Sequence, residues 1–416
     1  MTPAEKYYTF LDLTWPMNIM IVAELDVALP VDQVAEAWTR FCRLRSFPRL
    51  TAQADLTLRD IGPDRVEFSG EELRSDQWHA RMDEETVRPY GLDVPLRCRY
   101  YVSPSEERSR VVFVGHHAIV DGRVGVANLQ SFIRSLDGQA VVEQQMLSAP
   151  ANPVRPAGYP WQQDKGRLIE TLREISREHA ALGDVQPADW PESSIERSPT
   201  TRALVFDASD SEKFLFAMKD HGIRPLPAMA AVWLHAVRQH LVADVPTTLQ
   251  LGTAVDLAAR HEDPRRPAAM TVGVVANRFQ VDDGAPWALA QDVFREVGAS
   301  MDRGDGDLFF HLARVKAIDD LDAGRRVVAR SLEGAPPTVS VTNLGIVDPG
   351  SDPPWLRWMC GYLAPTPNQL VFVSGLGYRG LLVNSVTTDD LRLSPERAED
   401  LVATFRTQMG ELAPTP

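Results

Sequence analysis

Cysteine is scarce in this chain, with only three residues among 416. They are odd in number, widely separated and set among apolar neighbours, so the sequence shows neither a disulfide framework nor the spacing of a zinc site. A reducing cytoplasm is the compartment that fits this pattern best. The three positions are Cys42, Cys98 and Cys360.

Long apolar runs are also missing. The first residues, MTPAE, lack the basic region and apolar stretch of a signal peptide, and no uninterrupted apolar segment approaches the length that crosses a bilayer. We therefore expect a cytoplasmic protein without a membrane span.

Positive charge is in deficit. Lysine and arginine number 43 against 57 aspartates and glutamates, which gives a formal net charge of −14 and argues against nucleic acid or anionic lipid as a partner. Hydrophobic residues at 44% and charged residues at 24% are typical of an ordered globular protein, and no repeat or low-complexity tract is evident.

Length and the order of predicted elements favour an α/β fold in two domains. A chain of 416 residues exceeds the size at which a single hydrophobic core usually stops growing. Four prolines between residues 149 and 160 indicate a crossover. We predict an N-terminal domain over residues 1–160 and a C-terminal domain over residues 161–416.

Both parts alternate strand and helix patterns. The first begins with a helix that Thr2 caps, since Pro3 and Glu5 follow at the positions that favour a helix start. For the second part the sequence predicts strands over 202–206, 247–255, 270–281, 338–341, 370–374 and 381–385, and helices over 165–182, 211–221, 227–241, 287–301 and from 394 onward.

The most informative stretch is VGHHAIVDGR, residues 114–123. Residues 96–102 and 110–115 are predicted strands joined by a charged turn, and the second runs straight into the two histidines. Beyond Gly122, apolar residues recur at helical spacing. The histidines therefore lie where a buried strand gives way to a loop and a helix, a common place for functional groups in α/β sheets.

His116, His117 and Asp121 form a group suited to acid–base chemistry. A neutral imidazole, whose ordinary pKa is about 6.5, can take a proton from an incoming hydroxyl or amine. The aspartate can hold the loop by accepting backbone hydrogen bonds or by pairing with an arginine. Gly122 lets the chain turn where a side chain would obstruct it.

Three other interpretations compete. A metal site is disfavoured because no other histidine supplies a third ligand at a recognisable spacing. A triad hydrolase is disfavoured because Ser374, in VSGLG, lacks the glycine that should stand two residues earlier. A satisfied core histidine would be the better interpretation of one histidine alone, but the combined pattern is more specific and favours catalysis.

HHAIVDG, residues 116–122, resembles the HHxxxDG motif of the acyltransferase superfamily that contains chloramphenicol acetyltransferase, plant BAHD acyltransferases and peptide-synthetase condensation domains. The likeness extends over nearly the whole chain, which looks most like the stand-alone bacterial polyketide-associated acyltransferases. It implies two similar α/β sandwich domains of the chloramphenicol acetyltransferase type, with an active-site tunnel between them.

The resemblance also implies roles for the motif residues. His117 would be the general base, while His116 and Asp121 would be structural. Gly122 would shape the loop and offer its backbone N–H to the tetrahedral oxyanion. The neighbouring Arg123 is a candidate contact for a substrate phosphate or carboxylate, with an outward salt bridge as the alternative.

Two later segments resemble the superfamily as well. AVDLAAR, which ends at Arg260, keeps one of the two arginines usual in relatives, and the resemblance pairs it with Asp121; a surface position is the alternative. SVTNLG, residues 340–345, resembles a strand end that lines the tunnel. It makes Ser340 a candidate substrate contact and Asn343 a candidate donor to the oxyanion, unless this segment forms an ordinary turn.

The function that follows is acyl transfer from an acyl-CoA or acyl-carrier protein thioester to a small alcohol or amine acceptor, with no cofactor besides that donor and no metal. The DFGWG of the plant group is absent, and Arg123 and Val124 follow the motif where condensation domains often have an aromatic residue or serine. A stand-alone condensation catalyst that forms an amide, or a silent module that docks a carrier protein, are the alternatives.

Overall fold

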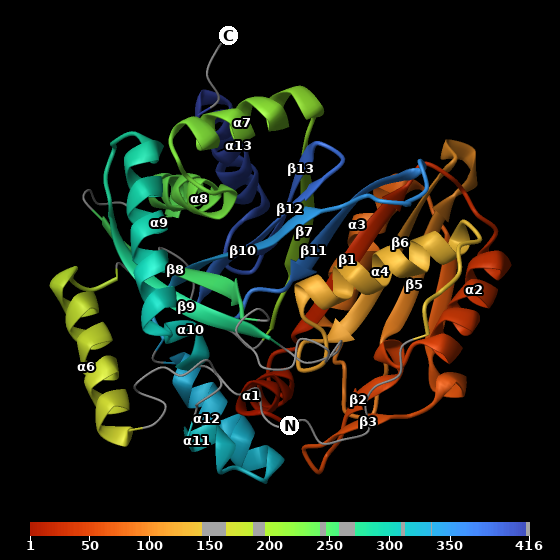
Figure 1. Cartoon of the computed structure of the whole chain (residues 1–416), viewed down its shortest axis with the longest axis horizontal. Helices are drawn as coiled ribbons and strands as arrows, with labels where there is room; N and C mark the ends of the chain where they lie inside the picture. Colours follow the sequence, from red (N-terminus) through yellow and green to blue (C-terminus); the bar gives the residue numbers. More distant parts are fainter. Residues whose placement is uncertain are drawn as a thin grey trace.

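The computed structural model places two mixed β-sheets beside one another, each covered by helices (Figure 1). It describes residues 1–143, 164–185, 196–241, 247–257, 271–308, 313–333 and 335–412. In this part of the chain the strands form a five-stranded sheet in the order β11-β1-β6-β5-β4, a six-stranded sheet in the order β7-β13-β12-β10-β8-β9, and a short β2-β3 pair. The predicted α/β class is confirmed.

The strands run over β1 (Asn18–Leu25), β2 (Leu50–Ala52), β3 (Leu58–Asp60), β4 (Glu67–Glu72), β5 (Arg97–Ser103), β6 (Arg108–His116), β7 (Pro199–Phe206), β8 (Thr247–Asp256), β9 (Val272–Val281), β10 (Thr338–Val347), β11 (Leu356–Leu363), β12 (Gln369–Tyr378) and β13 (Leu381–Asp389).

The helices run over α1 (Pro3–Asp12), α2 (Val31–Leu44), α3 (Trp78–Val87), α4 (Gly122–Leu136), α6 (Lys165–Ala181), α7 (Ala208–Asp220), α8 (Pro225–Leu241), α9 (Pro286–Arg303), α10 (Asp305–Leu308), α11 (Ala313–Lys316), α12 (Leu321–Glu333) and α13 (Pro395–Leu412).

The five-stranded sheet is buried on both faces. All eight residues of β1 are buried, which explains why its sequence, NIMIVAEL, is nearly continuous in apolar residues. Helices α2 and α4 cover one face, where Trp38, Phe41, Phe113 and Phe132 pack together. Helix α3 covers the other face. Strand β6 thus carries the two histidines to the end of a rigid sheet.

The six-stranded sheet has one apolar face and one face that is largely small and polar. Helices α7, α8, α9 and α13 pack on the apolar face (Figure 1). Met229, Trp233 and Phe279 lie in this core, and Met359 lies in the core of the first sheet. The opposite face is free to line a cavity.

One strand from the C-terminal part of the chain belongs to the N-terminal sheet. β11 follows most of the C-terminal part along the chain, yet it pairs antiparallel with β1 and forms the edge of the N-terminal sheet. The sequence did not predict β11 or α12. The proposed boundary near residue 160 falls outside the described residues and stays a prediction.

The sequence also did not predict β2, β3, β4, α3, α10 or α11, whereas the elements that it did predict lie close to their predicted positions. β10 and β12 extend several residues beyond the predicted 338–341 and 370–374, and β10 does so through an irregularity between Asn343 and Ile346. The three cysteines are buried and free, as expected. Across the described residues, no helix combines the length and apolar character that a membrane crossing requires.

Candidate active site

The first helix holds both motif histidines. α1 begins with the predicted cap, since Thr2 accepts from the Glu5 N–H and the Glu5 carboxylate accepts from the Thr2 N–H. Tyr8 and Asp12 follow four residues apart and therefore share one face of the helix. Tyr8 packs against His117, and Asp12 faces His116.

His116 is buried between the strand end and α1. Its Nδ1 accepts a hydrogen bond from the Ala118 N–H at 3.0 Å, and its Nε2 lies 3.6 Å from the Asp12 carboxylate. The side chain is 1% exposed and does not line the cavity. Burial lowers its pKa, and the Asp12 charge opposes that change only in part. His116 thus fixes the strand end to α1.

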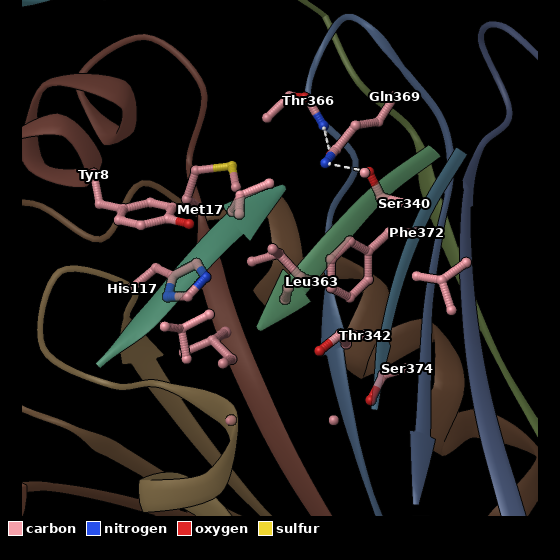
Figure 2. A pocket seen from close by; sticks show the side chains of 18 of the residues that line it. Tyr8, Met17, His117, Ser340, Thr342, Leu363, Thr366, Gln369, Phe372 and Ser374 are labelled. Carbon is pink, nitrogen blue, oxygen red and sulfur yellow. Dashed lines mark hydrogen bonds between the residues drawn. The ribbon is translucent and has the colours of Figure 1, made fainter. Parts of the chain in front are cut away.

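His117 presents one nitrogen to a cavity. Its Nδ1 lies 3.0 Å from the Val120 carbonyl oxygen, which can only accept, so Nδ1 carries the proton and Nε2 is left with its lone pair. The Tyr8 ring lies over the imidazole with centroids 4.1 Å apart and planes inclined by 31° (Figure 2). Both side chains line the cavity. This ring is held in the tautomer that a general base requires.

Burial also keeps His117 neutral. Loss of solvent lowers its pKa to about 4, although the hydrogen bond to the Val120 carbonyl favours the protonated form. A neutral imidazole is therefore the dominant form across the physiological range.

Asp121 caps the helix that follows the motif. Its Oδ1 accepts from the Val124 N–H at 2.8 Å, and its Oδ2 faces the Thr271 N–H of the C-terminal half at 3.5 Å. Burial raises the pKa of this carboxyl. Arg260, its predicted partner, lies outside the described residues, so that pairing stays a prediction.

We expect Asp121→Ala to destabilise the protein by about 1–2 kcal/mol, because a helix cap is lost and a buried amide loses its acceptor. Thermal unfolding of the variant and of Asp207→Ala, which removes the cap of α7 far from the cavity, provides the measurement. Activity per folded molecule should fall only for Asp121→Ala. Equal activity in the two variants would show that the Asp121 cap does not hold the motif loop in an arrangement that activity requires.

Gly122 is the first residue of α4, where a backbone N–H has no acceptor within the helix. A Cβ at this position would collide with the Leu344 side chain from β10. The glycine therefore allows β10 to approach the motif loop, and both residues line the cavity.

Arg123 crosses from the motif to the other sheet. Its guanidinium pairs with the Asp256 carboxylate at the end of β8, with the arginine side chain 55% exposed. The structure shows the predicted salt bridge, between two residues that both line the cavity, and the contact of Arg123 with a substrate stays a prediction.

The cavity lies between the two sheets and has a volume of about 410 Å³. One side consists of mainly apolar and aromatic residues from α1, β1, the residue before β1, and β11: Tyr7, Tyr8, Leu11, Met17, Ile19, Ile21, Gly361, Tyr362 and Leu363. The other side is the second face of the six-stranded sheet. It is contributed by β9 (Val272, Val274, Ala276), β8 (Gln250, Gly252, Ala254, Asp256), β10 (Thr338, Ser340, Thr342, Asn343) and β12 (Phe372, Ser374).

The two C-terminal candidates lie in this cavity. The Asn343 Oδ1 accepts from the Gly345 N–H at 2.8 Å, and Gly345 has a φ of 87°, so this segment forms a bulge within β10 rather than a turn between elements, and Asn343 lines the cavity. Ser340 lies three residues earlier on β10 and accepts a hydrogen bond from Gln369 at 2.7 Å. Together with His117, Gly122 and Arg123, these residues surround one space.

Sequence reasoning missed Tyr8, Asp12 and Gln369. The i,i+4 spacing of Tyr8 and Asp12 on a capped helix was the available signal for the first two. Nothing in the sequence points to Gln369, which begins β12 directly after a loop. The described residues include no group of histidine, cysteine, aspartate and glutamate side chains that would hold a metal ion.

No family model and no curated protein matches the sequence. Solved structures do match its fold. A trichothecene 15-O-acetyltransferase from Fusarium sporotrichioides has a TM-score of 0.71 at 11% identity, over 100% of this chain and 94% of that one. Polyketide synthase associated protein 5 from Mycobacterium tuberculosis has a TM-score of 0.62 at 14% identity, over 98% and 97%.

A third match is the first condensation domain of the calcium-dependent antibiotic synthetase, with a TM-score of 0.63 at 14% identity, over 97% of this chain and 93% of that domain. The chain therefore has the two-lobed fold that acetyltransferases and condensation domains share. At the level of the fold, the resemblance drawn from HHAIVDG is confirmed.

Proposed function

We propose that this protein transfers an acyl group from a thioester, carried by CoA or by a carrier protein, to the hydroxyl or amine of a small acceptor. The observation that supports this proposal most directly is the orientation of His117. Its Nδ1–H is bound to the Val120 carbonyl, its Nε2 is unprotonated, and the ring lines a cavity large enough for a substrate.

In the proposed reaction, His117 Nε2 takes the proton of the acceptor as its oxygen or nitrogen attacks the thioester carbonyl carbon. The tetrahedral oxyanion forms beside the start of α4, where the Gly122 N–H and the positive end of the helix favour negative charge. Collapse of the intermediate breaks the C–S bond. The imidazolium returns its proton to the departing thiolate, and an ester or amide remains.

Burial makes it harder for His117 to accept a proton, because it lowers the pKa of the imidazole. An imidazole whose pKa is about 4 is a weak base in the free enzyme. The developing oxyanion stabilises the imidazolium, so the two charges compensate each other in the transition state. Asn343 lines the same space and is proposed as a further contact to the oxyanion.

The pH dependence follows from the lowered pKa of His117. The active form is the neutral imidazole, so kcat/KM should stay level from about pH 8 to about pH 5 and fall only as the pH approaches 4.

The free energy of unfolding should also fall as the pH is lowered. Because the folded pKa lies below the unfolded value of about 6.5, the unfolded state takes up protons first, and stability is lost as the pH falls from 6.5.

A pH profile of thiol release, with circular dichroism at each pH to correct for unfolding, measures this. An acid limb near pH 6.5 in a protein that remains folded would contradict the burial of the base.

The experiment that tests the function is release of free thiol from a series of acyl-CoAs, short to long, with mixed alcohol and amine acceptors. Release that depends on the acceptor supports acyl transfer. Release with water alone would indicate a hydrolase instead. Absence of release with every acyl-CoA calls for the same assay with carrier-protein thioesters, and a second negative result would contradict the proposal.

Amide formation is the second candidate, because a condensation domain is among the structures that share this fold. The same assay separates it, since only amine acceptors would then support thiol release. A carrier-protein docking module without activity would bind an acyl-carrier protein and release no thiol.

A further inference from the structure

A cluster of uncharged polar side chains lies in the cavity at the first half of β10. It consists of Gln250, Thr338, Ser340, Thr366 and Gln369, which we name the carboxamide cluster. Figure 2 shows the part formed by Thr366, Gln369 and Ser340. The mechanism described above does not use this cluster.

Backbone groups fix the orientation of Gln369. Its Oε1 receives a hydrogen bond of 2.7 Å from the Thr366 N–H, which can only donate. Its Nε2 must therefore be the atom that donates to the Ser340 Oγ, also at 2.7 Å. Since Ser340 accepts in this bond, its own O–H proton is available to a ligand in the cavity.

The orientation of Gln250 is fixed by the same logic. The Thr338 hydroxyl donates to the Pro336 carbonyl at 2.9 Å, so it must accept from the Gln250 Nε2, which lies 2.9 Å away. Gln250 Oε1 is then left as a hydrogen-bond acceptor in the cavity wall. β8 and β10 are parallel neighbours, with Thr338 opposite Gln250 and Ser340 opposite Gly252.

A glycine keeps this part of the wall open. A Cβ at Gly252 would lie 3.1 Å from Thr338 Cγ2 and 3.3 Å from Ser340 Oγ, and would crowd the serine hydroxyl. The cluster thus presents one oriented donor and one oriented acceptor. It carries no formal charge, and the ionised side chains among the described lining are the paired Arg123 and Asp256.

We propose that the carboxamide cluster binds an uncharged substrate group that both donates and accepts a hydrogen bond, a hydroxyl or a secondary amide. An ionised group would lose its hydration there without gaining an opposite charge. Ser340 lies three residues from Asn343, so the bound group lies about 10 Å along β10 from the Gly122 end of the cavity. Gln369 is a positioning residue that orients the Ser340 hydroxyl.

This inference rests on the proposed function, which supplies the two substrates, acceptor and thioester donor, to which the bound group can belong. The acceptor can carry a second hydroxyl, or the thioester donor can carry secondary amides in its arm. Binding measurements in the His117→Ala background separate these sources, since that variant should bind both without turnover.

Two matched pairs of probes serve as ligands, with dissociation constants from ligand-observed NMR. 1,8-Octanediol against 1-octanol reports a second hydroxyl, and S-acetylpantetheine against S-octyl thioacetate reports secondary amides. We expect at least one pair to show a preference of about 3- to 10-fold for the more polar member, the usual worth of one or two hydrogen bonds. Preference in the diol pair assigns the cluster to the acceptor, and preference in the amide pair assigns it to the donor.

Gln369→Leu should remove this preference. Ser340→Ala should remove it as well, and this second variant provides the test if Gln369→Leu folds poorly. Gln130→Leu is the matched control, because its carboxamide also makes two hydrogen bonds but lies outside the cavity. It should keep the preference. Equal affinities of the parent protein and Gln369→Leu for all four probes, absence of binding included, would overturn the proposal whatever the outcome of the thiol assay.

Discussion

His117→Ala is expected to lower acceptor-dependent thiol release by about 10²- to 10⁴-fold, the range that a positioned general base contributes. The change removes the only histidine that lines the described cavity. The variant should still fold, because the imidazole makes only one backbone hydrogen bond and one ring contact, and it lines a cavity rather than filling the core. The measurement is kcat/KM together with thermal unfolding of the same preparation.

His116→Ala is the matched control for this prediction. The same substitution one residue earlier removes a ring that does not line the cavity but accepts the Ala118 N–H and faces Asp12. It should lower thermal stability more than His117→Ala does and retain more activity per folded molecule. Wild-type thiol release by a folded His117→Ala protein would eliminate this residue as the base.

The local part of the site could be predicted from the sequence. HHAIVDG follows an apolar strand and precedes an amphipathic helix, and these signals lie within about twenty residues of one another. The structure places His116, His117, Asp121 and Gly122 at the strand end, in the helix cap and in the first helical turn, because those geometries depend on neighbouring residues alone.

The partners of these residues could not be predicted, because they come from distant segments. Tyr8 and Asp12 precede the motif by about a hundred residues, and Asp256 follows Arg123 by 133. A helix pattern shows which residues share a face but not what that face meets. For the same reason the sequence could not show that Arg123 pairs with Asp256, because that contact depends on the position of β8.

Strand β11 shows the same limit at the level of the fold. Its sequence, LRWMCGYL, is mostly apolar, and such a strand could pair within either sheet. Only the antiparallel pairing with β1 decides the matter, and it joins a segment near the C-terminus to the N-terminal sheet. The cavity wall that β11 supplies, through Gly361, Tyr362 and Leu363, was therefore not foreseen.

Helix α1 connects the two motif histidines to the C-terminal half. It places Tyr8 on His117 and Asp12 beside His116, while its other contacts reach α11 and α12. Lys6 Nζ donates to the Ile318 carbonyl at 2.7 Å. Phe10, fully buried, lies against Gly324 of α12, so closely that a Cβ on the glycine would enter its ring. The position of α1, and hence of the Tyr8 ring against His117, depends on this contact.

Gly324→Ala should therefore lower activity from a position outside the cavity. The new methyl group cannot fit beside the Phe10 ring, so α1 must shift and carry Tyr8 and Asp12 with it. Overpacking of this kind costs about 1–3 kcal/mol, against at most about 1 kcal/mol that alanine returns in helix propensity. We expect a net loss of stability and a fall of about tenfold or more in kcat/KM.

Gly298→Ala in α9 is the control, because a Cβ there meets no atom within 4 Å. That variant should be as stable as the wild type or more stable, and equally active.

The decisive measurement is the acid limb of the pH profile in Gly324→Ala, because α1 keeps solvent away from His117. Displacement of Tyr8 should move the limb upward from about pH 4 toward the ordinary histidine value. A variant that loses stability but keeps the wild-type rate and acid limb would show that α1 stabilises the fold without controlling the position or the pKa of His117.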